Sequence, residues 1–375
     1  MDNPFKNLFG NISIFNSSSV NSAVGIDIGS SSIKVVEIKK KEGKAVLETY
    51  GAIALGPYAD TDIGRVTNLP IEKIFEALKE VLKQSGVVTT SSAFAIPAQS
   101  SLIFSIELPG QVKENEIPSI VPNEARKYIP LPINEVSLDY FLFPKKESSF
   151  EEANNLDVAD SSLQKKEVLV VAIQNDAISK YRSLVNQLNL KSDFFEVEIF
   201  SSIRANFDHE LSPVLLMDLG ASRTKLSIVE FGAVRSFHTI NRGGADITES
   251  ISKTLSIPFS KAEEMKKEYG LFGNPSEQNL TDIIKTHIDY IFSETNNVLL
   301  GYEKKYDRTI SKVILTGGGS LLKGVAEVAT SNFRMDVVTG HPFSKIKAPA
   351  FLEKVLEVTG PEFAIALGLA LRKLQ

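Results

Sequence analysis

A short polar motif occurs twice in this chain, each time between two apolar segments. It reads D-I-G-S-S-S-I-K at residues 27–34 and D-L-G-A-S-R-T-K at residues 218–225, so both copies follow the pattern D-x-G-x-S-x-x-K. One strand-like apolar run precedes each copy, a second follows it directly, and a third comes later. These runs occupy residues 24–28, 35–38 and 45–54 in the first half of the chain and residues 214–217, 226–229 and 233–240 in the second half. Such self-similarity predicts a duplicated α/β fold whose halves open with the same hairpin.

The residue types in this motif suit a polyphosphate. Gly29 and Gly220 would permit tight turns and close backbone approach, while the following amides, hydroxyls and lysines would meet phosphate oxygens. Asp27 and Asp218 would repel phosphates unless a divalent cation and its waters lay between them, so the motif implies Mg²⁺. If the two halves face each other, both turns reach a shared cleft, and we expect Asp27 and Lys34 to face its solvent.

Two further patterns accompany the motif. Residues 313–320, V-I-L-T-G-G-G-S, predict a strand that runs into glycines before a helix at 321–329, where a ribose or an α-phosphate would approach the backbone; an ordinary turn is the alternative. The segment R-G-G-A-D-I-T at 242–248 precedes a helical pattern. A helix is also predicted at 262–270, where it ends at a glycine cap. Its Glu263 and Lys266, three positions apart, would contact an adenosine, or form part of a solvated face.

Composition excludes several other classes of function. The 375 residues are long for a single core and favour two lobes, and the net charge of −5 argues against nucleic acid as a partner. The chain has no cysteine, and its four histidines form no HxxxH or HExxH pattern, so thiolate chemistry is excluded and a histidine metal site is disfavoured. No apolar stretch reaches the length of a membrane span. Residues 1–21 suit either a flexible leader or an amphipathic, membrane-seeking helix.

Taken in this order, the two polar motifs and the later glycines resemble the nucleotide-binding signature of the actin, Hsp70 and sugar-kinase superfamily. Within it, the chain is similar to the PilM family of type IV pilus assembly proteins, which is related to FtsA. The residues that carry this likeness are G-I-D-I-G-S-S-S-I-K-V-V-E at 25–37, E-A-R-K-Y-I-P-L-P at 124–132, D-Y at 139–140, and H-P-F at 341–343, where the family has Asn in place of His341.

The resemblance implies an α/β, two-lobed actin-like ATPase fold with ribonuclease H-like duplicated domains and an FtsA-type extra subdomain, 1C. The implied segments are a leader at 1–21, subdomain 1A at 22–90 and 167–211, subdomain 1C at 91–166 with a disordered loop at 145–166, subdomain 2A at 212–240 and 309–345, subdomain 2B at 241–308, and a segment at 346–375 that returns to 1A.

The resemblance also implies an ATP site with Mg²⁺. The β- and γ-phosphates would lie against Gly29, Ser30, Ser31, Ser32 and Lys34 from one lobe and Gly220, Ala221, Ser222 and Thr224 from the other, with Gly243 and Gly244 completing that end. The α-phosphate and ribose would contact Gly317, Gly318 and Gly319, and the adenosine would contact Glu263 and Lys266. Asp27 and Asp218 would order the waters of Mg²⁺.

The implied function is that of a cytoplasmic ATP-binding scaffold of the type IV pilus, or of a related type II secretion platform, at the inner face of the membrane. Its implied partners are a PilN-like membrane protein, other platform proteins and a further copy of the chain. The amino-terminal peptide of the PilN-like protein would contact Arg126, Tyr128, Ile129 and Pro130. An FtsA-like division filament and a small-molecule kinase are the alternatives. We expect slow ATP hydrolysis at most, since the sequence shows no convincing residue for activating water; Gln174 and Asp176 are weak candidates.

Overall fold

The computed structural model describes residues 20–143, 165–208, 210, 212–273 and 278–375. The expected leader at 1–21 and the expected loop at 145–166 therefore fall almost entirely outside the described residues. Of those described, 98–179 form a smaller compact unit and the others form a larger one.

The larger unit contains two five-stranded sheets that share one topology. The first sheet has the order β3-β2-β1-β4-β8 and the second the order β11-β10-β9-β12-β13. In each sheet the first three strands of the sequence pair antiparallel, and the last two run parallel to the first. The predicted duplication is thus confirmed. The strands are β1 Ser22–Ile28, β2 Ser32–Lys41, β3 Lys44–Ala54, β4 Ser92–Ile96 and β8 Phe195–Val197, then β9 Val214–Leu219, β10 Thr224–Glu230, β11 Ala233–Ile240, β12 Lys312–Thr316 and β13 Asp336–Thr339.

The parallel strands place the predicted motifs at one edge of each sheet. Since β1, β4 and β8 run parallel, their carboxyl ends meet at the same edge, and the first D-x-G motif begins there. In the second sheet the second D-x-G motif follows β9, and the glycines at 317–319 follow β12 at the matching edge. The carboxyl edge of parallel strands is where α/β sheets bind ligands.

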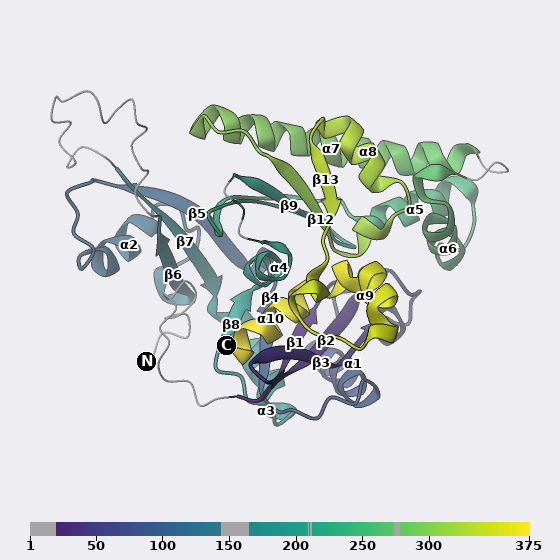
Figure 1. The fold of residues 1–375 in the computed structure, drawn as a ribbon, viewed down its shortest axis with the longest axis horizontal. Coiled ribbons are helices and arrows are strands. Elements are labelled where there is room, and N and C mark those ends of the chain that lie inside the picture. Colours follow the sequence, from purple (N-terminus) through teal and green to yellow (C-terminus); the bar gives the residue numbers. More distant parts are fainter. Residues whose placement is uncertain (1–19, 144–164, 209, 211, 274–277) are drawn as a thin grey trace. The chain divides into compact units, whose positions relative to one another are not determined.

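Helices cover both sheets. The long helix α7 lays Leu280, Ile284 and Phe292 on the second sheet, with α5, α6 and α8 around it (Figure 1). In the first sheet, α1 packs against β2 and β3, and α10 packs against β1. The larger unit's helices are α1 Ile71–Gln84, α4 Glu198–Asn206, α5 Gly244–Leu255, α6 Phe259–Tyr269, α7 Gln278–Tyr306, α8 Val325–Phe333, α9 Glu353–Thr359 and α10 Ala364–Leu374, and α3 Asn175–Gln187 begins in the smaller unit. We call the first sheet with α1, α4 and α10 the first lobe, and the second sheet with α5 to α8 the second lobe.

Close backbone contacts fix the last helix on the first lobe. A Cβ added to Gly25 in β1 would lie 1.8 Å from the carbonyl oxygen of Ala366 in α10, and one added to Gly368 would lie 1.9 Å from the carbonyl oxygen of Ser201 in α4. No side chain fits at either position. The predicted return of the carboxy-terminal segment to the first lobe therefore has a steric basis in these two glycines.

The smaller unit is a three-stranded antiparallel sheet with one helix against it. The strand order is β5-β7-β6, with β5 at Ser101–Leu108, β6 at Val136–Leu142 and β7 at Lys166–Gln174. The helix α2, Ile117–Ala125, buries Ile117, Val121 and Ala125 against this sheet because they lie four residues apart on one face.

The pairing of the strands places the boundaries of the smaller unit at residues other than those expected from the sequence. The boundary expected at 91 would assign Ser92–Ile96 to the extra subdomain, but β4 lies between β1 and β8 in the first sheet. The boundary expected at 166 would assign Lys166–Gln174 to the first lobe, but β7 is the central strand of the smaller unit. Both strands have a continuous apolar stretch, residues 93–96 and 168–173, and this pattern alone does not indicate which sheet surrounds them.

Within the described ranges, no helix combines the length and the apolar character that crossing a bilayer requires.

Candidate functional site

The spacing of the repeated motif places its aspartate opposite its lysine in each hairpin. In the first hairpin Asp27 pairs across the ladder with Lys34, and in the second Asp218 pairs with Lys225. The two turns close in the same way, since the amide of Gly29 donates to the carbonyl of Ser32 and that of Gly220 to the carbonyl of Arg223, each at 3.0 Å. Cross-strand partners project to the same face, so each turn presents one carboxylate beside one ammonium group.

The lysine of the second hairpin links the two lobes. Lys225 Nζ lies 2.8 Å from Asp218 Oδ2 and 2.8 Å from Glu198 Oε2, and all three side chains are largely buried. Glu198 is the first residue of α4, directly after β8 of the first lobe. The pairing holds the pKa of Lys225 above its usual range despite the opposing effect of burial. This lysine, which the sequence analysis placed beside phosphate, is engaged with two carboxylates.

The first hairpin carries an incompletely compensated charge. Asp27 is only 6% exposed, which contradicts the expectation that it faces solvent. Burial raises the pKa of its carboxyl to about 6, with the nearby Glu198 and Asp218 carboxylates adding to the effect and Lys34 and Lys225 opposing it. Lys34 Nζ donates to Ser32 Oγ at 2.9 Å. Three carboxylates thus share this region with two lysines, an excess of negative charge that a divalent cation would neutralise.

Main-chain hydrogen bonds join the glycines before α5 to the second turn. The amide of Gly244 donates to the carbonyl of Gly220 at 3.0 Å, and that of Ala245 to the carbonyl of Ala221 at 2.9 Å. A Cβ on Gly243 would lie 2.4 Å from the Ala221 oxygen, so only glycine allows this approach. The structure therefore brings Gly243 and Gly244 to the second turn. Thr224 is buried and donates to the carbonyl of Arg242, while Ser222 is half-buried.

The later glycines lie against the same turn. Gly317 has φ +78°, and a Cβ there would lie 2.2 Å from Asp218 Oδ1; a Cβ on Gly319 would lie 2.7 Å from Leu219 Cβ. Gly318 is exposed. The amide of Gly317 donates to the carbonyl of Pro361, which ties this turn to the carboxy-terminal segment. The glycines of residues 317–319 thus pack on the second D-x-G motif, with Gly318 at the surface.

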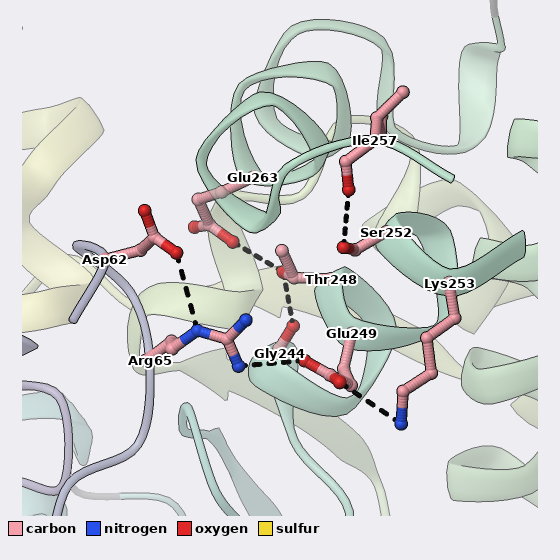
Figure 2. Close-up of polar contacts among 9 residues, drawn as sticks. All are labelled: Asp62, Arg65, Gly244, Thr248, Glu249, Ser252, Lys253, Ile257 and Glu263. Atoms are coloured by element: carbon pink, nitrogen blue, oxygen red, sulfur yellow. Dashed lines mark hydrogen bonds and ion pairs between the residues drawn. The ribbon is translucent and has the colours of Figure 1, made fainter. Parts of the chain in front are cut away.

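The predicted Glu263 and Lys266 pair lies at the base of α5. Lys266 Nζ donates to Glu263 Oε2 at 2.7 Å, to Thr248 Oγ1 at 2.8 Å and to the carbonyl of Gly244 at 2.9 Å. Burial lowers the pKa of Lys266, against the opposing effect of Glu263. Figure 2 shows Thr248 between Gly244 and Glu263. The pair is therefore partly buried and joined to the glycines of the second turn, rather than forming a solvated face.

The predicted peptide residues lie in the smaller unit. Arg126, Tyr128 and Pro130 are exposed, and the Tyr128 ring lies 5.1 Å from that of Phe104. Ile129 is buried in the core between α2 and the sheet. Gln174 and Asp176, the expected candidates for water activation, also belong to this unit, at the end of β7 and the start of α3.

Two residues near the site were missed by the sequence analysis. Glu198 reaches Lys225, and Arg65, in the segment between β3 and α1, reaches Glu249 of α5. The position of Glu198 at the carboxyl end of a parallel strand is a usable signal, because the other motifs occupy equivalent places. Arg65 has no such signal. Among the described residues, no group of three or more acidic or histidine side chains is placed to bind a metal directly.

Comparison with known proteins identifies relatives along most of the chain. The family model described as Type IV pilus assembly protein PilM matches residues 25–374. Cell division protein FtsA of Pseudomonas aeruginosa is 26% identical over 359 residues, covering 86% of this chain and 83% of that protein. FtsA of Neisseria meningitidis serogroup B is 26% identical over 198 residues, covering 47% of this chain and 48% of that protein.

Solved structures show the same fold. A PilM-PilN type IV pilus biogenesis complex superposes with a TM-score of 0.77 at 24% identity, covering 95% of this chain and 99% of that one. Ethanolamine utilization protein EutJ from Carboxydothermus hydrogenoformans gives a TM-score of 0.52 at 16% identity, covering 95% and 91%. The predicted two-lobed actin-like fold is confirmed. Since the family model covers nearly the whole sequence, this chain belongs to the type IV pilus assembly protein PilM family.

Proposed function

We propose that this chain is an actin-like scaffold of the type IV pilus assembly platform that holds Mg²⁺-ATP between its two D-x-G-x-S-x-x-K turns. The observation that carries the proposal is the pair of matching hairpins, each with a carboxylate opposite a lysine, within a chain that belongs to the PilM family. The excess of carboxylates around Asp27 supports a divalent cation as part of the bound species.

The roles of the site residues follow from their chemistry. Residues 29–32 and 220–222 would donate backbone amides and hydroxyls to the β- and γ-phosphates, with Lys34 adding charge. Asp27 and Asp218 would accept hydrogen bonds from the waters of Mg²⁺, a mode in which few carboxylates bind the ion directly. Gly317 and Gly318 would allow the α-phosphate and ribose to approach the backbone, and Glu263 and Lys266 would lie beside the adenosine.

The proposed partner is the cytoplasmic amino-terminal peptide of a PilN-like membrane protein. One solved structure with the same fold is a PilM-PilN complex, and the exposed side chains of Arg126, Tyr128 and Pro130 offer a charged, an aromatic and a rigid apolar contact. Binding to such a peptide would place this chain at the inner face of the membrane, beside other platform proteins and further copies of itself. In this role nucleotide would govern assembly, with slow hydrolysis at most.

Replacing Lys34 with Ala should weaken Mg²⁺-ATP binding by about 10- to 100-fold, because a charge-assisted hydrogen bond contributes about 1.5–3 kcal/mol. Isothermal titration calorimetry with Mg²⁺-ATP measures the affinity directly. Lys39→Ala is the matched control, since Lys39 is exposed on the same strand and should bind as the wild type does. Equal affinity in Lys34→Ala and Lys39→Ala would show that the phosphates lie elsewhere.

Replacing Tyr128 with Ala should weaken binding of a synthetic PilN-like amino-terminal peptide by about tenfold, as expected when an aromatic anchor is removed from an interface. Fluorescence anisotropy of the labelled peptide gives the affinity. Tyr290→Ala is the control, because Tyr290 is 49% exposed where Tyr128 is 53% exposed, but lies on α7. If both variants bind the peptide like the wild type, Tyr128 does not contribute to the peptide site.

A further inference from the structure

The segment between β3 and α1, residues 55–69, is hydrogen-bonded to the first polar turn. The amide of Leu55 donates to the carbonyl of Ser31 at 2.9 Å, and the amide of Thr67 donates to the carbonyl of Ser30 at 2.8 Å. The Thr67 hydroxyl donates to the same Ser30 carbonyl. Both ends of this segment are therefore fixed to the backbone of the residues proposed to hold phosphate, and its middle extends to the second lobe.

Arg65 contacts the second lobe through two partners, and a third partner in its own segment orients it. Its Nη1 lies 3.0 Å from Glu249 Oε2 on α5, and its guanidinium carbon lies 4.1 Å from the ring centre of Phe259 on α6. Its Nε lies 3.5 Å from Asp62 Oδ2 of its own segment, which orients the guanidinium plane (Figure 2). An ion pair together with a ring contact uses both the charge and the flat face of arginine, and lysine does not offer this combination.

The receiving helices are in turn fixed to the second polar turn. The first residue of α5, Gly244, is bonded to Gly220, as described above. The connection from α5 to α6 is hydrogen-bonded to α5, since Ser252 Oγ donates to the carbonyl of Ile257 (Figure 2). The amide of Ile257 also donates to the carbonyl of Ser252. Glu249 and Phe259 are therefore connected through α5 to the second polar turn.

The segment also passes close to the predicted adenosine residues. Gly64 has φ +92°, and a Cβ at this position would lie 3.2 Å from the carboxyl carbon of Glu263. Glycine suits this position on both counts, because L-residues disfavour positive φ and the side chain would crowd Glu263. The segment that carries Arg65 thus lies next to Glu263, one of the two residues predicted to contact the adenosine.

We propose that Arg65 is a latch between the two lobes, which slows the release of the nucleotide held by the two polar turns. This inference rests on the proposed function, since it assigns a regulation to the same site. A nucleotide that spans the two turns and an Arg65 contact that spans the same two lobes each favour the state in which the lobes are held together. Two interactions that favour one state strengthen each other.

The strength of the contact suits a reversible latch. The Arg65 and Glu249 side chains are each 36% exposed, so their ion pair is of the moderate kind found at surfaces, and the ring of Phe259 adds a cation–π contribution. The contact is more exposed than the pair of Lys225 and Glu198, which also joins the lobes. The Arg65 contact would open and close as nucleotide is exchanged while that pair remains, and its effect would appear mainly in the rate of dissociation.

The first test measures the dissociation rate of a fluorescent ATP analogue with Mg²⁺, chased with excess ATP in a stopped-flow instrument. Arg65→Ala and Glu249→Ala should each speed dissociation about fivefold, with little further effect when combined, because both remove the same contact. The exchanged pair Arg65→Glu/Glu249→Arg should restore part of the slow rate that each reversed single variant loses. Lys253→Ala is the matched control: Lys253 pairs with Glu249 inside α5 but does not reach the segment, so its rate should stay within about twofold of the wild type.

A second experiment measures the distance between the two lobes in the absence of nucleotide. Because the chain has no cysteine, spin labels can be placed selectively at Lys79→Cys on α1 and Lys285→Cys on α7, both exposed. Distances between the labels, measured by pulsed electron spin resonance, should lengthen or broaden in nucleotide-free Arg65→Ala relative to the labelled wild type. Unchanged distances together with unchanged dissociation rates would overturn the latch. If the wild type fails to bind the analogue, the nucleotide proposal is wrong, and the distances alone decide whether Arg65 joins the lobes.

Discussion

Asp27→Asn is expected to stabilise the nucleotide-free protein while removing Mg²⁺-dependent nucleotide binding. The structure places the Asp27 carboxyl among protein atoms, where burial raises its pKa from 3.8 to about 6. An ionised Asp27 therefore opposes folding at neutral pH, by about 2–3 kcal/mol at 1.36 kcal/mol for each pKa unit. Asparagine keeps the shape without the charge, so the free energy of unfolding should rise by about 1–3 kcal/mol.

The pH dependence gives this prediction its sign. Between about pH 4 and pH 6 the folded protein holds a proton on Asp27 that the unfolded chain has released, so its contribution to stability falls as the pH rises through this window. Above about pH 6 the loss is complete. Mg²⁺ prefers the ionised carboxylate, so the affinity for Mg²⁺-ATP should fall as the pH drops below about 6.

Urea unfolding and calorimetry at pH 5 and pH 7.5 test both halves of the prediction. The wild type should lose affinity for Mg²⁺-ATP at pH 5, whereas Asp27→Asn should bind weakly at both values. Asp218→Asn is the contrasting variant: it should also weaken Mg²⁺-ATP but should lower stability, because Asp218 pairs with Lys225. A gain of stability in Asp218→Asn and a loss in Asp27→Asn would reverse the charge balance inferred here.

Local pattern was enough to predict the repeated hairpins. An apolar run, a D-x-G turn and a second apolar run indicate two strands, and the i, i+7 spacing then sets Asp27 opposite Lys34 by ladder geometry. The glycines of residues 243–244 and 317–319 were found for a similar reason, since each follows or precedes a regular element. The ordered succession of these motifs carried the resemblance that implied the actin-like fold.

Long-range pairing was not accessible in the same way. Lys225 and Glu198 are separated by 27 residues, and Arg65 and Glu249 by 184, so no local periodicity links either pair. The burial of Asp27 also depends on the neighbouring strands and helix rather than on its own sequence. The sequence therefore indicated which segments form the candidate site, while the partners of their charges required the three-dimensional arrangement.

Lys225→Met should be among the most destabilising substitutions in the site. Lys225 Nζ lies 2.8 Å from both Asp218 and Glu198, and methionine would leave two largely buried carboxylates without their cation. Removing one partner of a buried ion pair costs about 3–5 kcal/mol, which is a large part of the stability of an ordinary domain. Because Glu198 and Lys225 belong to different lobes, the loss should also loosen the contact between them.

Two further variants separate this effect from the loss of a lysine in general. Lys34→Met should cost less, about 1.5–3 kcal/mol, because Lys34 Nζ donates to one hydroxyl, that of Ser32, and only partly offsets the charge of Asp27. The pairing holds the pKa of Lys225 above its usual range, so the lysine is protonated in unfolding experiments at pH 7.5. The cost of Lys225→Met in urea unfolding should shrink in the triple variant with Asp218→Asn and Glu198→Gln, because neither of the two groups that Lys225 contacts is then charged. If Lys225→Met costs no more than Lys34→Met at pH 7.5, the lysine does not hold the two lobes together.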